Sequence, residues 1–243
     1  MGCATRNAKV VAMSLGSLQR LISLKAVPRS AVPRLVATMN DAMSQGVDIQ
    51  LRILQTLVSL VPNFPDIHGD LLGEVSCFLD PDDRNQLTQY YKALLLCFKL
   101  QESRIAVVSS TAAATLRQLV MFVVDKMDVE DRLSETTDLD DSQLTQVKLP
   151  DGSVKKLGPS ALDAFSVFED LCLLANSEKP YFLKLEFLHK TFALELIESV
   201  LTNYHQLFRK VLSTFAFCPV SHSIIFSMTN SFCSSVITCV RFF

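Results

Sequence analysis

Apolar residues recur at steps of three and four along most of this chain, and this periodicity limits its fold more than any other feature. The first three stripes are Val11, Leu15, Leu18 and Ile22; Val32, Leu35, Met39 and Ala42; and Val47, Leu51, Leu54, Val58 and Val61. Such spacing places the apolar side chains on one face of an α-helix. Pro62 and Pro65 follow the third stripe, so we expect that helix to end there.

Four more stripes follow later in the chain. They are Leu87, Tyr91, Leu94 and Phe98; Leu116, Val120, Val123 and Met127; Ala161, Phe165, Phe168, Cys172 and Ala175; and Ala193, Ile197, Val200, Tyr204 and Leu207. The third of these begins after Pro159-Ser160, which we expect to cap its helix. The last is extended at its front by Leu188 and Phe192 and predicts the longest helix. Helices this apolar need neighbours on two sides, which favours an all-α fold, an α-solenoid of stacked antiparallel helices of the armadillo/HEAT-like kind.

Residues 132–159 interrupt the helical pattern. The stretch is acidic and carries little apolar content before Leu144. A Pro-Asp-Gly turn at 150–152 separates two short alternating runs, which is typical of a small hairpin or an irregular loop. We therefore interpret 132–159 as a linker that is partly disordered, between helical domains at 1–131 and from 160 onward.

Composition excludes several classes of protein. The 243 residues are 49% hydrophobic and 20% charged, which is typical of a folded chain, and the 7 glycines favour helices over a β-rich fold. The net charge of −2 argues against nucleic-acid binding. The 7 cysteines form no C-x-x-C pair and several lie in apolar stripes, which indicates a reducing compartment.

The motifs that carry common chemistry are missing from the sequence. It contains no G-x-G-x-x-G, G-x-x-x-x-G-K-[ST], G-x-S-x-G or H-E-x-x-H. His189 and His205 stand too far apart on one predicted helix to share a metal ion. We therefore predict no catalytic, cofactor-binding or metal residue and no small-molecule substrate, and the partner-binding residues stay unknown.

Two carboxylate pairs are the remaining candidates for catalysis. Glu195 and Glu198 are three residues apart, so they share a helix face and could act as an acid–base pair. A solvated face is the favoured interpretation, since charged residues mostly lie exposed. Glu169 and Asp170 are adjacent, so on a helix they point in different directions.

Two further features have a structural and a functional interpretation. Cys172 has Phe165 and Phe168 at helical spacing, which favours a core thiol over a nucleophile. Tyr181 and Phe182 could form an exposed aromatic anchor, although covering a helix pair is the commoner role.

The two ends of the chain are unusual. Met1-Gly2-Cys3 is similar to an acylation start, but Arg6 stands where Ser or Thr is needed, so we do not expect acylation. The tail 211–243 lacks Asp, Glu and Lys and has the length of a membrane span. Its proline, histidine and serines favour a poorly ordered or non-native C-terminus instead.

Four strings of the sequence resemble a known family. They are residues 12–22 (AMSLGSLQRLI), 110–120 (STAAATLRQLV), 168–176 (FEDLCLLAN) and 191–201 (TFALELIESVL). The first two resemble the dimerisation and cyclophilin-binding domain of the Mon-two (monensin-sensitivity) family of Golgi and endosome trafficking proteins. The last two resemble the start of its homology-upstream-of-Sec7 domain. The strings stand in the family's order and cover most of residues 7–210.

The resemblance implies a non-catalytic scaffold in endosome-to-Golgi vesicle trafficking and protein transport, in the cytoplasm and peripheral on Golgi and endosome membranes. It also implies Dopey-type proteins and Arf-like small GTPases as partners, and a possible homodimer. Such proteins are related to the large Sec7-type Arf exchange factors but lack the Sec7 catalytic domain. The alternative is the N-terminal regulatory fragment of a true Sec7-type Arf guanine-nucleotide exchange factor.

The sequence departs from the family pattern in two segments. Residues 74–92 look inserted within 1–131, and the resemblance stops near Lys210, so that 160–210 resembles only the start of the upstream domain. The atypical tail 211–243 begins there. We expect both segments to be intron-derived, in a truncated or mispredicted product.

Overall fold

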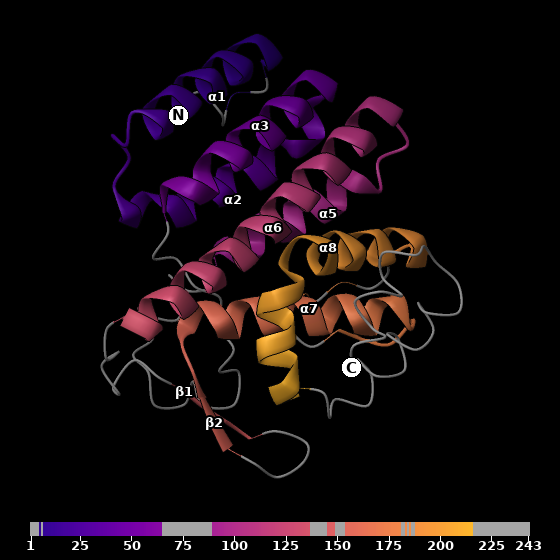
Figure 1. The fold of residues 1–243 in the computed structure, drawn as a ribbon. Helices are drawn as coiled ribbons and strands as arrows, with labels where there is room; N and C mark the ends of the chain where they lie inside the picture. Colours follow the sequence, from indigo (N-terminus) through magenta and orange to yellow (C-terminus); the bar gives the residue numbers. More distant parts are fainter. Residues whose placement is uncertain are drawn as a thin grey trace. The chain divides into compact units, whose positions relative to one another are not determined.

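The computed structural model describes residues 5, 7–64, 89–136, 145–148, 154–180, 183, 185 and 188–215 (Figure 1). The chain divides into two compact units, Met1–Leu119 and Val120–Phe243. The division falls inside one helix, α6, which runs from Ala106 to Thr136. The predicted insertion at 74–92 lies almost wholly outside the described residues, as does the tail after Phe215.

The first unit is a stack of helices. It contains α1 (Ala8–Ser23), the short 3₁₀ helix η2 (Arg29–Ala31), α2 (Val32–Ala42), the 3₁₀ helix η3 (Met43–Gln45), α3 (Val47–Asn63), α5 (Gln89–Gln101) and the start of α6. The main packing of α1 is against α3, and that of α2 is against α5 (Figure 1). The predicted stripe of α1 supplies Val11, Leu15 and Ile22 to the core, all almost fully buried.

The helix α3 forms where predicted, but its buried face is shifted. Leu54 and Val61 of the predicted stripe are buried, as are Ile53 and Leu57 outside it, whereas Leu51 and Val58 of the stripe are only half-buried. The helix ends at Asn63, between Pro62 and Pro65, as expected. Pro62 has no amide hydrogen to donate to the preceding turn, and the helix continues for only one residue after it.

One glycine makes the start of α3 possible. Gly46 is the residue before the helix, and its φ of 129° lies in the region that only glycine adopts without strain. This conformation turns the chain from η3 into α3, and the Gly46 carbonyl accepts the first helical bond from the Gln50 amide at 3.0 Å.

The helices α5 and α6 are apolar on more than one face. In α5 the buried residues include neighbours such as Leu96, Cys97 and Phe98, which is typical of a helix covered on several sides. The prediction that the last helix is the longest was wrong, because α6 has 31 residues and α8 has 26. The first residues of α6 are small, so the apolar stripe of this helix was too weak to predict its full length.

Length and composition alone would allow one helix of the described residues to cross a membrane. The segment is Ala106–Leu133 of α6, with 44% of its most apolar stretch buried inside the protein. Residues such as Leu116, Val120 and Val123 are almost fully buried. The core helix of a folded protein meets the same criterion, so this segment is weak evidence for a membrane span.

The second unit begins with a hairpin. Strands β1 (Thr145–Lys148) and β2 (Val154–Leu157) pair antiparallel, with Thr145 opposite Leu157 and Lys148 opposite Val154. The hairpin that the alternating runs predicted is therefore confirmed. Within the segment 132–159, α6 extends to Thr136 and the next helix begins at Pro159, so the linker itself stays a prediction.

Two helices complete the second unit. They are α7 (Pro159–Ala175) and α8 (Lys190–Phe215), which pack against each other (Figure 1). Nearly all residues of α7 are buried, including the polar Ser166 and Asp170. The helix α8 buries its predicted stripe but is kinked at Tyr204, whose φ of −124° and ψ of 29° are not helical.

The predicted all-α, solenoid-like fold class is confirmed, with one two-stranded hairpin added among the described residues. The predicted domain limits of 1–131, 160–210 and 211–243 stay predictions. The helix α8 runs past residue 211 without a break, as far as Phe215.

Candidate protein-binding groove

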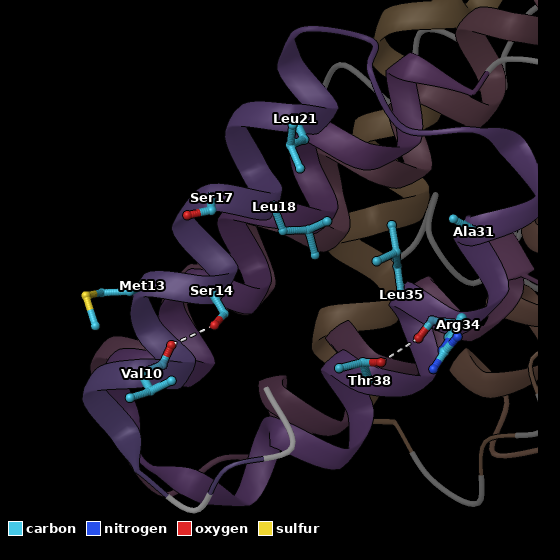
Figure 2. A pocket seen from close by; sticks show the side chains of 10 residues that line it. All are labelled: Val10, Met13, Ser14, Ser17, Leu18, Leu21, Ala31, Arg34, Leu35 and Thr38. Atoms are coloured by element: carbon cyan, nitrogen blue, oxygen red, sulfur yellow. Dashed lines mark hydrogen bonds between the residues drawn. The ribbon is translucent and has the colours of Figure 1, made fainter. Parts of the chain in front are cut away.

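A groove of about 690 Å³ lies between α1 and the η2–α2 segment (Figure 2). Six of its lining residues come from α1 and four from η2 and α2. They are Val10, Met13, Ser14, Ser17, Leu18 and Leu21, and Ala31, Arg34, Leu35 and Thr38. The lining is therefore mostly apolar, which is typical of a surface that binds another molecule.

The groove exists because its two walls pack on different neighbours. The main packing of α1 is against α3 and that of α2 is against α5, so the two helices do not close on each other. Leu18 and Leu35 belong to predicted core stripes, yet both are only half-buried. Figure 2 shows them projecting into the space between the helices. The groove is thus apolar surface of core type that no other described part of the chain covers.

Two of the three hydroxyl groups that line the groove, those of Ser14 and Thr38, are engaged inside their own helices. Ser14 Oγ donates to the carbonyl oxygen of Val10 at 2.8 Å, and Thr38 Oγ1 donates to that of Arg34 at 2.7 Å (Figure 2). Intrahelical bonds of this kind leave the methyl and methylene groups to face the groove. A lining with so few converging polar groups suits apolar side chains of a partner better than a charged small molecule.

Large hydrophobic residues extend this surface along the outside of α1. Met13 is 66% exposed, Leu21 is 47% exposed, and Leu24, just after the helix, is 76% exposed. Single exposed hydrophobics are ordinary, but these three, here called the apolar patch, lie on or just after the helix that forms one wall of an apolar groove. This patch and the groove are the strongest candidate for an interaction site among the described residues.

The carboxylates that the sequence singled out range from exposed to buried. Glu195 is exposed and Glu198 half-exposed on α8, as the solvated-face interpretation predicts. Asp170 is buried and accepts a hydrogen bond from the Leu183 amide, which fixes the chain after α7. Burial, and then the charge of Asp170, raise the pKa of the half-buried Glu169. The adjacent pair thus has two different environments.

The remaining sequence candidates are in structural positions or outside the described residues. Cys172 is buried among apolar side chains, in agreement with a core thiol. His189 is exposed, and nothing is described of the His205 side chain or of Tyr181 and Phe182. Within the parts of the chain that the structure describes, no group of three His, Cys, Asp or Glu residues could hold a metal ion.

Sequence reasoning missed the contact that begins α7. We expected Pro159-Ser160 to cap this helix, but the cap position is Gly158 and no side chain of the segment itself caps it. Instead, Glu130 of α6 accepts hydrogen bonds from the Ser160 amide at 2.9 Å and the Ala161 amide at 3.2 Å. A carboxylate at a helix N-terminus is favourable because it satisfies amides that lack a helical partner.

Sequence reasoning also missed the contact at the kink of α8. The Tyr204 hydroxyl donates a hydrogen bond to the Asp125 carboxylate, 79 residues earlier on α6. Burial raises the pKa of Tyr204, and so do this hydrogen bond and the charges of Asp125 and Asp128. No local pattern in the sequence indicates a pair so far apart.

Comparison with known families identifies the class of this chain. The family model of the Mon2/Sec7/BIG1-like dimerisation and cyclophilin-binding (DCB) domain matches residues 1–131, more than half of the chain, and so includes the groove. The chain belongs to the Mon2/Sec7-related family. The Mon2/Sec7/BIG1-like HUS domain model matches residues 160–242, beyond Lys210, where we expected the resemblance to stop. These domains are non-catalytic regions of Sec7-like proteins.

Full-length Mon2 proteins from distant organisms are similar to this chain. The Protein MON2 homolog of Homo sapiens is 32% identical over 86% of the chain, and that of Drosophila melanogaster is 30% identical over 86%. Protein MON2 of Saccharomyces cerevisiae is 27% identical over 84%. The chain spans about a tenth of the length of these relatives, 11% to 12%. No solved structure matches it.

Proposed function

We propose that this chain is a non-catalytic scaffold in endosome-to-Golgi vesicle trafficking and protein transport, which acts through protein–protein contacts. The observation that carries the proposal is the DCB match over residues 1–131 together with an apolar groove in the same region. Membership of the Mon2/Sec7-related family relates the chain to trafficking proteins. The proposed location is the cytoplasmic face of Golgi and endosome membranes, as a peripheral protein.

The proposed partners are proteins. Dopey-type proteins and Arf-like small GTPases follow from the family, and a second copy follows from the name of the DCB domain. The nearly neutral overall charge, −2, does not favour nucleic acid. The mostly apolar lining of the groove does not favour a small polar substrate.

A regulatory fragment of a Sec7-type Arf exchange factor is the second candidate. One observation supports it, since the matching models are shared by Mon2, Sec7 and BIG1-like proteins. The full-length relatives compared above are Mon2 proteins, which favours the scaffold.

The localisation of the tagged full chain in cultured cells tests the scaffold proposal. We expect it on membranes that carry Golgi or endosome markers, and we expect alkaline carbonate to release it, as it releases peripheral proteins. The variant Leu21→Glu should reduce this recruitment, because it places a charge on the apolar patch. The matched control is Leu133→Glu, because Leu133 is 54% exposed and does not line the groove. A diffuse distribution of the wild-type chain would contradict the proposal.

An exchange assay separates the two candidates. The chain is added to a purified Sec7 catalytic domain and an Arf-type GTPase loaded with fluorescent GDP. A scaffold leaves the rate of GDP release unchanged, whereas a regulatory fragment of an exchange factor alters it. Binding to a purified Dopey-type protein, without an effect on exchange, is the result that the scaffold proposal expects.

A further inference from the structure

The N-terminal segment that forms the groove is rich in cations. Residues 1–42, up to the end of α2, contain one acidic residue, Asp41, although the whole chain has a net charge of −2. The cationic residues of this segment are Arg6, Lys9, Arg20, Lys25, Arg29 and Arg34. The walls of the groove therefore carry a local positive charge that the overall composition conceals.

Cations border the apolar lining on both sides. Lys9 and Arg20 stand four residues before and seven residues after Met13, spacings that place all three on the outer face of α1. Arg34 lies on the opposite wall, on α2, and is exposed (Figure 2). An occupant of the groove thus meets apolar side chains in the middle and positive charge at each edge.

We propose that the groove receives an amphipathic helix of a partner protein, whose apolar stripe is flanked by Asp or Glu. The stripe would pack on Leu18 and Leu35, and an acidic side chain would pair with Arg34. From Val10 to Leu21 the α1 wall covers about three helical turns, so an occupant of about that length fits along it. Helix-in-groove binding uses apolar anchors at steps of three and four, and complementary charge selects the partner.

Shape and charge distinguish this occupant from two others. The surface between α1 and α2 is concave, which suits the ridge of a helix better than the flat surface of a membrane. A second copy that docked groove to groove would bring the same cations to the interface, and like charges at an interface repel. The inference rests on the proposed scaffold function, for which it names the chemistry of one partner.

A designed peptide tests the proposal on the full chain. The probe has 14 residues, leucines at helical steps of three and four, glutamates on both flanks and a fluorescent label. Its control has lysine in place of every glutamate. We expect the acidic peptide alone to bind, with an affinity measured by fluorescence anisotropy that falls as salt rises.

Matched charge reversals locate the binding site. Arg34→Glu should weaken binding of the acidic peptide by about tenfold or more, since an attraction becomes a repulsion. Arg104→Glu makes the same change at an exposed cation of the α5–α6 connection, away from the groove, and should leave binding unchanged. Leu21→Glu should also weaken it, whereas Leu133→Glu should not. Circular dichroism confirms that each variant is folded.

Three results would overturn the proposal. Equal weakening by Arg34→Glu and Arg104→Glu would show attraction to the whole surface. Binding to phosphatidylserine vesicles that Arg34→Glu abolishes, without binding of the acidic peptide, would show a lipid surface instead. If neither peptide binds while the tagged chain still reaches the Golgi, the proposal of an acidic partner helix is wrong and the scaffold proposal is not affected. If the acidic peptide binds but the tagged chain does not reach the Golgi, the scaffold proposal is contradicted instead.

Discussion

At the scale of single residues, the start of α7 depends on a glutamate from another helix. The Glu130 carboxylate accepts bonds from two amides of the first turn, and Gly158 leaves the room for it. A Cβ at position 158 would lie 2.1 Å from Glu130 Oε1, closer than two such atoms can approach. The glycine and the glutamate therefore act as one unit.

Replacement of Glu130 should destabilise the second unit. In Glu130→Ala the Ser160 and Ala161 amides lose their partner, which should lower the free energy of unfolding by ~1 kcal/mol, as for other lost helix caps. Glu130→Gln is the control, because its amide oxygen still accepts a hydrogen bond, and it should lose less. Urea unfolding measures both. If Glu130→Ala and Glu130→Gln lose the same stability, the negative charge of Glu130 matters and its role as a hydrogen-bond acceptor does not.

Gly158→Ala should cost stability only while Glu130 is present. The backbone of Gly158, with φ −73° and ψ 165°, is open to any residue, so the penalty comes from displacing the glutamate. In wild type we expect a loss of roughly 1–2 kcal/mol, and in the Glu130→Ala background a loss of only a few tenths. A double-mutant cycle by urea unfolding gives the coupling. Additive losses would contradict the steric explanation.

At the scale of elements, periodicity predicted that helices form more reliably than it predicted which face they bury. Helix α3 buries Leu54 of the predicted stripe together with Ile53 and Leu57, whereas Leu51 and Val58 of that stripe stay half-buried. Apolar residues lie around more than one face of this helix, and its packing, mainly against α1, decides which of them are covered. Capping by Glu130 was equally beyond prediction, because its partners are 30 and 31 residues away.

The groove could be predicted only in its parts. The stripes that contain Leu18 and Leu35 were correct as helix faces, and both residues were expected in the core. Their partial exposure follows from the different packing partners of α1 and α2, which no local pattern encodes. A residue that fits the core pattern but stays exposed can therefore be recognised only once the helices are placed.

The kink of α8 should depend on pH through Tyr204. The pKa of this phenol is raised in the folded chain above its ordinary value of 10.0, so the folded state holds the proton more tightly than the unfolded state. The resulting stability is complete below pH ~10 and is lost as pH rises through the raised pKa. We expect wild type to lose more stability than Tyr204→Phe as the pH rises above ~10, measured by urea unfolding.

The same variant has a test at neutral pH. Tyr204→Phe removes the hydrogen bond to Asp125 and should cost ~1 kcal/mol there. Asp125→Asn keeps an acceptor and is the matched control, with a smaller expected loss. Parallel pH profiles of wild type and Tyr204→Phe would contradict the role of the phenol.

At the scale of the whole molecule, both units contain a part of one continuous helix. The division between them falls after Leu119, in the middle of α6. Helix formation is cooperative along a chain, so melting in one part of α6 favours melting in the next. We therefore expect the units to unfold together.

Two buried thiols can report this coupling. Cys97 lies in the first unit and Cys172 in the second, and burial raises the pKa of Cys97, which keeps it protonated and unreactive. With a thiol reagent and mass spectrometry, both should become reactive at the same urea concentration. In Gln118→Pro, which breaks α6 at an exposed position, the two midpoints should separate, since proline costs ~3 kcal/mol or more inside a helix. Separate midpoints in wild type would show independent units.

The reach of α6 into the second unit has a practical consequence for anyone who dissects this protein. A fragment that starts at residue 160, where the HUS match begins, discards Asp125 and Glu130 and leaves the opening amides of α7 bare. If that fragment is unstable in solution, the instability would reflect the position of the cut and would say nothing about the stability of the domain itself. A fragment that starts at residue 120 keeps both carboxylates and is the better choice.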